Sequence, residues 1–217
     1  MAMYNHCVIL ACFLVIPAYL IGNIPFSVLV AKIAGHDLYE KGSGNPGASN
    51  VARIAGWKWG ILAMTLDILK GFIPTLSVLI FADDFLNPQQ TRVIAYLVAF
   101  ATMLGHVVPI GRKGGKGIAT GGGAALALFP LAGIAAILTW VIMMKITKIP
   151  AISSIVAAAV LPIWIGIDHY YWWEFVVVTL LFVFVTLRHI PNIRRLMRRE
   201  ESGVTKSGRD QYQEDKN

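Results

Sequence analysis

The feature that most constrains this chain is a succession of long apolar segments separated by short polar loops. The segments fall at about 7–30, 59–81, 92–110, 117–129, 131–147, 150–167 and 174–190. A membrane-spanning helix needs roughly 20 mostly apolar residues, and most of these segments reach or approach that length. Charged residues are only 14% of the chain, too few to cover a soluble fold. The sequence therefore predicts an all-α, polytopic integral membrane protein with about seven transmembrane helices.

The segments 117–129 and 131–147 meet at Pro130, so they form either one long helix or a tight hairpin. Proline removes a backbone donor and bends the chain, and Pro130 with Gly133 favours the hairpin. That choice places the basic loops 31–58, 111–116 and 145–148 and the basic tail on one face, and the acidic loops 82–91 and 167–174 on the other.

Lys and Arg concentrate on cytoplasmic loops. We therefore expect the N-terminus outside and the C-terminus in the cytoplasm. Residues 1–200 are predicted to form a single transmembrane domain, followed by a polar, disordered tail at 201–217.

The first basic loop is rich in glycine and small polar residues, and it reads GSGNPGASN at 42–50. Such a loop lets backbone N–H groups form a concave anion site. Ser49 or Asn50 suits the N-cap of a following helix, whose N-terminus would face the same anion, and Arg53 follows as a phosphate clamp. The alternatives are a flexible linker, in which Asn, Pro and Arg are not typical, and a dinucleotide-binding turn, which would require a preceding strand.

Two further basic segments carry polar residues that suit phosphate. The second loop, GRKGGKGIAT at 111–120, places Lys113 and Lys116 among glycines where a helix begins. A basic anchor for anionic lipid is the alternative. The segment RHIPNIRR at 188–195 closes the last span. Its His189 is either structural or an acid, base or hydrogen-bond donor beside Asn192 and Arg195.

Charged residues also occur within the second apolar segment. Asp67 and Lys70 are three residues apart, so they share a helix face and are expected to form a buried ion pair near the site. Their role, structural or catalytic, stays open at this stage. His106 precedes the second loop, and Ser154 begins a later span as a further donor. The sequence contains neither a nucleophile elbow nor a cluster of metal ligands.

Taken together, these motifs resemble the acyl-phosphate:glycerol-3-phosphate acyltransferases, the bacterial membrane family called PlsY. The resemblance covers roughly 18–196 and rests on GSGNPGASN at 42–50 with Arg53, LDILKG at 66–71, GH..P with KGGKGIAT at 105–120, and RH..NI.R at 188–195. It implies a compact seven-helix fold in the bacterial inner membrane, with its active site on the cytoplasmic side. It also implies transfer of a fatty acyl group from acyl phosphate, not from acyl-CoA or acyl carrier protein, to glycerol 3-phosphate.

The resemblance and the chemistry of the residues together predict three sets of site residues. The predicted catalytic residues are Lys116, His189 and Ser43. The predicted phosphate- and substrate-binding residues are Asn45, Gly47, Ser49, Asn50, Arg53, Lys113, Ser154, Asn192 and Arg195. The predicted supporting residues are Asp67, Lys70 and His106.

The expected partners are glycerol 3-phosphate, long-chain acyl phosphate, the lipid bilayer and the enzyme that produces acyl phosphate. Neither a cofactor, a metal nor a nucleic acid is expected. A transporter of a phosphorylated small molecule and a non-catalytic lipid-binding scaffold are the alternatives, and the absence of an internal repeat disfavours the transporter.

Overall fold

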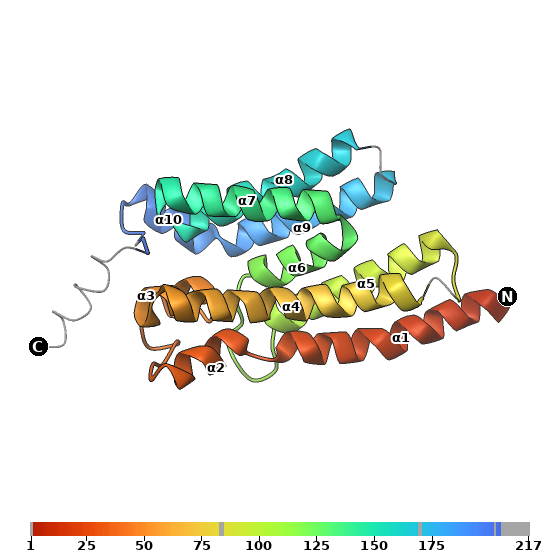
Figure 1. The fold of residues 1–217 in the computed structure, drawn as a ribbon, viewed down its shortest axis with the longest axis horizontal. Helices are drawn as coiled ribbons and strands as arrows, with labels where there is room; N and C mark the ends of the chain where they lie inside the picture. Colours follow the sequence, from red (N-terminus) through yellow and green to blue (C-terminus); the bar gives the residue numbers. More distant parts are fainter. Residues whose placement is uncertain (1, 83–84, 169–170, 202, 205–217) are drawn as a thin grey trace, which may run out of the picture.

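The computed structural model describes residues 2–82, 85–168, 171–201 and 203–204, in which every regular element is an α-helix (Figure 1). The helices are α1 (Ala2–Asn23), α2 (Phe26–Ile33), α3 (Ala48–Ala55), α4 (Trp57–Phe81), α5 (Pro88–Val107), α6 (Ile118–Leu128), α7 (Pro130–Thr147), α8 (Pro150–Ile167), α9 (Trp172–Arg188) and α10 (Ile190–Met197). The all-α prediction is confirmed for this part of the chain.

Proline residues mark most of the helix boundaries. α5, α7, α8 and α10 each carry a proline in the first turn, where the missing N–H costs no intrahelical hydrogen bond. The break between α6 and α7 falls at Phe129 and Pro130. A Cβ on Gly133 would lie 2.5 Å from the Cα of Leu126, so α7 folds back closely against α6. The segment 117–147 is therefore two packed helices, as the proline and glycine predicted.

Four helical segments are long and apolar enough to cross a membrane: Ala11–Ile33, Trp57–Phe81, Pro130–Thr147 and Pro150–Ile167. A fifth candidate combines α9 and α10, which are bent by 52° at His189. Only 17–33% of the most apolar windows of the four segments is buried inside the protein, which leaves apolar side chains facing outward, as lipid requires. α6 is a shorter apolar helix of 11 residues.

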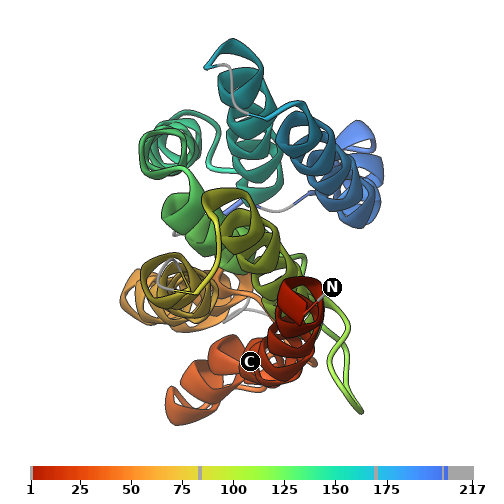
Figure 2. The same cartoon turned by 90° about the vertical axis from the view of Figure 1, so that its right-hand side faces the viewer.

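Small residues allow the central helices to approach closely. A Cβ on Gly71 of α4 would lie 2.0 Å from the carbonyl oxygen of Thr120, and one on Gly123 of α6 would lie 2.0 Å from that of Ile68. Membrane helices use such residues to bring backbones together. Figure 2 shows α6 between a group formed by α7, α8 and α9 and a group formed by α1, α2, α4 and α5. The glycine contacts thus hold α6 closely against α4.

The basic loops gather at one end of the helical bundle. Lys113 Nζ donates to the carbonyl of Gly44 at 3.1 Å, which joins the second loop to the first. Arg188 Nη2 donates to the carbonyl of Gly115 at 3.1 Å, which joins the end of α9 to the second loop. In Figure 1, α3 and α10 lie at this end, and the start of α1 lies at the other. The motifs that are distant in sequence therefore meet.

Candidate functional site

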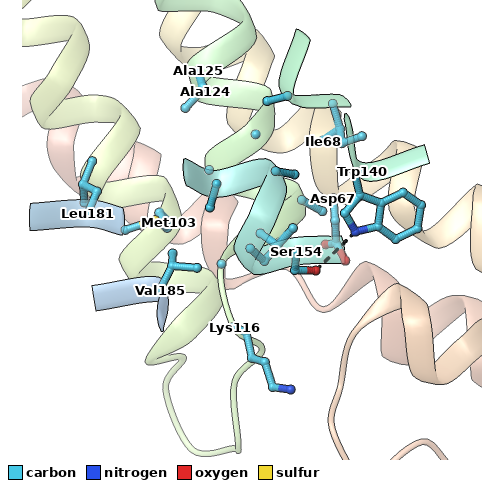
Figure 3. Close-up of a pocket in the computed structure, with 18 of the residues that line it drawn as sticks. Asp67, Ile68, Met103, Lys116, Ala124, Ala125, Trp140, Ser154, Leu181 and Val185 are labelled. Carbon is cyan, nitrogen blue, oxygen red and sulfur yellow. Dashed lines mark hydrogen bonds between the residues drawn. The ribbon is translucent and has the colours of Figure 1, made fainter. Parts of the chain in front are cut away.

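A cavity of about 550 Å³ connects the basic end of the bundle with its apolar interior. Figure 3 shows Lys116 and Ser154 on its wall, with Trp140 beside Ser154 and the apolar side chains of Leu181 and Val185 nearby. Most predicted site residues line it: Ser43, Asn45, Gly47, Ser49, Asn50, Arg53, Asp67, His106, Lys116, Ser154, His189 and Asn192. Lys70, Lys113 and Arg195 do not belong to this lining.

The first glycine-rich loop is organised by the buried side chain of Asn50. Its Oδ1 accepts hydrogen bonds from the backbone N–H of Ser43 (2.9 Å) and from Arg53 Nη1 (3.3 Å), and its Nδ2 donates to two carbonyls earlier in the loop. The predicted N-cap role of Ser49 or Asn50 was wrong. The N-cap of α3 is Gly47, whose backbone is extended, and both residues lie inside the first turn. The Asn50 amide is used instead to hold the loop and aim Arg53.

The second loop places a lysine in the polar end of the cavity. Lys116 Nζ donates to Asn192 Oδ1, and α6 begins directly after it at Gly117, whose φ of 87° favours glycine. Burial lowers the pKa of Lys116 to about 8, and the carboxylate of Glu201 partly opposes that effect. Nearby arginines lower the pKa further. The ammonium is therefore held close to other cations, an arrangement that an anionic ligand would stabilise.

His189 lies at the break between α9 and α10. Its Nδ1 lies 2.8 Å from the carbonyl oxygen of Val185, and a carbonyl can only accept, so Nδ1 carries the proton. In the neutral ring, Nε2 is then available as an acceptor. The side chain is buried and lines the cavity. His189 is thus positioned to receive a hydrogen bond or a proton from a bound hydroxyl group.

Ser154 stands in the first two turns of α8 and is held by an aromatic neighbour. Trp140 Nε1 of α7 donates to Ser154 Oγ at 3.2 Å (Figure 3). The hydroxyl oxygen therefore accepts from the indole, while its own hydrogen remains available to donate to a ligand. Sequence reasoning did not single out Trp140, because a tryptophan in an apolar helix carries no signal of its partner.

The predicted ion pair in the second apolar segment is confirmed, with Lys70 Nζ 2.7 Å from Asp67 Oδ1. Asp67 Oδ2 accepts from Ser27 Oγ at 2.7 Å, and Lys70 Nζ donates to the carbonyl of Ile24 at 3.0 Å. Lys70 Nζ also lies 2.9 Å from His106 Nδ1. This cluster connects three parts of the fold: the break between α1 and α2, helix α4 and helix α5. Asp67 and His106 line the cavity, whereas Lys70 does not.

Two predicted phosphate-binding residues, Lys113 and Arg195, do not line the main cavity. Lys113 directs its ammonium to the carbonyl of Gly44, outside the main cavity. Arg195 Nε donates to Glu201 Oε2 at 2.6 Å. Glu201 lines the cavity, although the sequence assigned it to a disordered tail. Residues 202 and 205–217 of that tail lie outside the described residues. Within the described part of the chain, no group of three or more His, Cys, Asp or Glu could hold a metal ion.

These features define a multi-pass helical membrane protein whose site joins a cationic, amide-rich pocket to an apolar cavity. Such a pocket fits a phosphorylated ligand with an apolar chain. Residues 12–199 match the family model described as "Glycerol-3-phosphate acyltransferase". The chain belongs to this family.

The relatives align with this chain over most of their length. The glycerol-3-phosphate acyltransferase of Thioalkalivibrio sulfidiphilus is 38% identical over 199 residues, which are 90% of this chain and 95% of the relative. That of Roseiflexus sp. is 45% identical over 149 residues, which are 68% of this chain and 70% of the relative.

Two solved structures of PlsY (YgiH), an integral membrane glycerol 3-phosphate acyltransferase, are also similar. The glycerol 3-phosphate form is 36% identical, with a TM-score of 0.79 over 89% of this chain and 94% of the other. The lysophosphatidic acid form is 34% identical, with a TM-score of 0.77 over the same shares.

Proposed function

We propose that this protein transfers a fatty acyl group from acyl phosphate to glycerol 3-phosphate. The product is lysophosphatidic acid, and the reaction is the first acylation step of phospholipid synthesis. The observation that carries the proposal is the joining of two kinds of surface in one cavity: Lys116, Arg53 and Asn192 at one end, and apolar helix faces at the other. Cations and amides suit the phosphate groups of both substrates, and the apolar faces suit a fatty acyl chain.

The reaction requires no covalent enzyme intermediate, because acyl phosphate is already activated. A hydroxyl oxygen of glycerol 3-phosphate attacks the acyl carbon, the new C–O ester bond forms, and the C–O bond to phosphate breaks. Lys116 stabilises the departing phosphate, and backbone N–H groups near Ser43 add to this effect. His189 Nε2 accepts the hydroxyl proton directly, or a phosphate oxygen does so. Arg53 and Asn192 hold glycerol 3-phosphate in line for attack.

The arrangement in the membrane follows from the charge pattern. We propose about seven crossings, with short α6 and bent α9–α10 each completing one, the N-terminus outside, and the basic end in the cytoplasm of a bacterial inner membrane. The contact between the loops containing Gly44 and Lys113 supports a common face. Acyl phosphate then enters laterally from lipid, supplied by the enzyme that makes it.

The test is a donor comparison with purified protein in detergent. Palmitoyl phosphate and labelled glycerol 3-phosphate should give labelled lysophosphatidic acid, whereas palmitoyl-CoA should give none. The matched control is Lys116→Met protein prepared in the same way. Product formation from acyl-CoA alone would refute the donor assignment. Counterflow of labelled glycerol 3-phosphate in proteoliposomes, without any lipid product, would identify a transporter instead.

A further inference from the structure

Three aromatic side chains meet at the end of the cavity that lies far from the basic loops. Tyr96 of α5, Phe129 at the end of α6 and Trp173 of α9 all line the cavity. The ring centroid of Tyr96 lies 6.3 Å from that of Phe129 and 5.1 Å from that of Trp173, and both contacts are edge-to-face, which aromatic pairs prefer. In Figure 1, the starts of α5 and α9 lie at the end opposite α3 and α10. These three residues are here called the aromatic floor.

A buried ion pair lies directly behind the aromatic floor. Arg92 Nε of α5 donates to Glu174 Oε1 of α9, and the Glu174 side chain is fully buried. The guanidinium carbon of Arg92 lies 5.1 Å from the ring centroid of Phe129, which is a cation–π contact. Only 2% of Phe129 and 7% of Tyr96 are exposed. Because a charge within an apolar bundle is costly unless it is paired, this pair holds α5 and α9 together and keeps the rings in place.

The depth of the aromatic floor matches the length of the acyl chain of a membrane lipid. Along α5, Tyr96 precedes His106 of the cavity lining by ten residues, or about 15 Å of helix. Along α9, Trp173 precedes His189 by sixteen residues, or about 24 Å. One acyl chain fills half of a hydrocarbon core of about 30 Å, which is about 15 Å. A chain of that length, starting from the polar end of the cavity, therefore reaches the rings.

We infer that the aromatic floor sets the longest acyl chain that the protein accepts, because the end of the chain lies against Tyr96, Phe129 and Trp173. This role rests on the proposed function, since the chain is that of the acyl phosphate. The chain enters from lipid or detergent, so an extra methylene group gains little hydrophobic free energy in the cavity, and steric fit decides. Overpacking a filled apolar space typically costs a factor of about five to one hundred, and we expect this loss in kcat/KM for a chain that is too long.

An open side of the cavity supplies the competing interpretation. Val93, Leu97 and Phe100 of α5 line the cavity and are 42–47% exposed, so the cavity is open along this face. If the chain left the cavity there, its end would lie in lipid and would never contact the aromatic floor. Truncating a floor residue would then leave the accepted chain lengths unchanged. If the floor stops the chain, the same truncation favours longer donors.

The kinetic experiment measures kcat/KM for palmitoyl phosphate and for the longer icosanoyl phosphate, with glycerol 3-phosphate saturating. Trp173→Ala should raise the ratio of icosanoyl to palmitoyl kcat/KM by a factor of about five to one hundred, because it removes a ring from the floor. Trp172→Ala is the matched control, since Trp172 is the neighbouring side chain, is 78% exposed and should not alter the ratio. The ratio compares two donors on one preparation, so a lower fraction of folded protein cancels. An unchanged ratio in Trp173→Ala would overturn the inference.

A second variant should have the opposite effect. Val177 lines the cavity one helical turn nearer the polar end than Trp173, on the same face of α9. Val177→Phe should therefore shorten the space, and it should raise the ratio of lauroyl to palmitoyl kcat/KM by a similar factor, about five to one hundred. The control Val176→Phe adds the same ring at the adjacent exposed position and should leave this ratio as it is. Equal ratios in Val177→Phe and Val176→Phe would contradict a floor that limits length.

A binding experiment separates this inference from the proposed function. If the unchanged protein makes no lysophosphatidic acid from any of these donors, the proposed function fails. The chain-length limit is then measured with hexadecyl and icosyl phosphate, which have no acyl group to transfer, as the rise in thermal unfolding temperature. Hexadecyl phosphate should stabilise the unchanged protein more than icosyl phosphate does, and Trp173→Ala should remove or reverse that difference. An equal rise from both compounds in the unchanged protein would refute a length limit.

Discussion

Removal of the Lys116 ammonium is the sharpest test of the site. Lys116→Met keeps the length and most of the volume of the side chain and deletes its charge. In the structure, the ammonium contacts Asn192 Oδ1 and faces the cavity beside Arg53. The substitution therefore removes one cation from the position where charge develops on the departing phosphate, and it leaves the Asn192 oxygen without that donor.

The expected loss follows from what one such group contributes in other enzymes. Removing a single oxyanion-stabilising donor typically lowers kcat by about 10²–10³-fold, or about 2.7–4 kcal/mol. We expect a loss of that size in kcat for Lys116→Met. Lys145→Met is the matched control, because Lys145 is an exposed lysine in the last turn of α7, at the same basic end of the bundle. It should retain activity within about twofold, as surface substitutions usually do.

The assay is release of inorganic phosphate from palmitoyl phosphate in the presence of glycerol 3-phosphate, at saturating concentrations of both substrates. Folding of each variant is checked by size-exclusion chromatography in the same detergent. If Lys116→Met raised KM and left kcat unchanged, Lys116 would contribute uniform binding and not transition-state stabilisation. Equal activities of Lys116→Met and Lys145→Met would refute the assignment of the site.

Three further predictions concern pH, packing and the buried ion pair. Burial lowers the pKa of Lys116 to about 8, so the ammonium loses its proton and kcat/KM should fall as pH rises through about 8. In Lys116→Arg, kcat/KM should not fall over that pH range. Gly123→Ala should lower the unfolding temperature by several degrees, because the new Cβ would lie 2.0 Å from the carbonyl oxygen of Ile68. The control Gly122→Ala should leave the unfolding temperature unchanged, because its Cβ would have no neighbour within 4 Å. Asp67→Asn should lower the free energy of unfolding by about 3–5 kcal/mol, because it leaves the buried Lys70 ammonium without its partner. The double variant Asp67→Asn/Lys70→Met should recover part of that lost stability, because it also removes the unpaired charge.

Local sequence determined most of the helices and the chemistry of the loops. Apolar segments long enough to span a bilayer can satisfy their backbone groups only as helices, so the pattern alone predicts them. Proline in the first turn of α7 marked the break near Phe129, because the ring prevents the preceding residues from continuing a helix. The pairing of Asp67 with Lys70 also followed from spacing, since residues three apart share a helix face.

Several site details depended on contacts that sequence spacing does not encode. Lys113 and Lys116 are equivalent as local patterns, yet only Lys116 lines the cavity, because Lys113 is bound to the Gly44 carbonyl of another loop. Asn50 resembled a helix cap, but its side chain is taken by the loop that precedes α3. In each case a partner outside the residue's own helix or loop decided which hydrogen bonds the side chain makes.

The sequence by itself determined that this chain is a helical membrane protein whose basic, glycine-rich loops suit phosphate, because apolar length and local charge are properties of short segments. Only the tertiary structure decided which residues meet. Close helix contacts at Gly71 and Gly123 hold α6 against α4, and Glu201 of the predicted tail lines the cavity beside Asn192. The contact between Lys116 and Asn192, which are 76 residues apart, is a long-range packing outcome for which no local pattern exists.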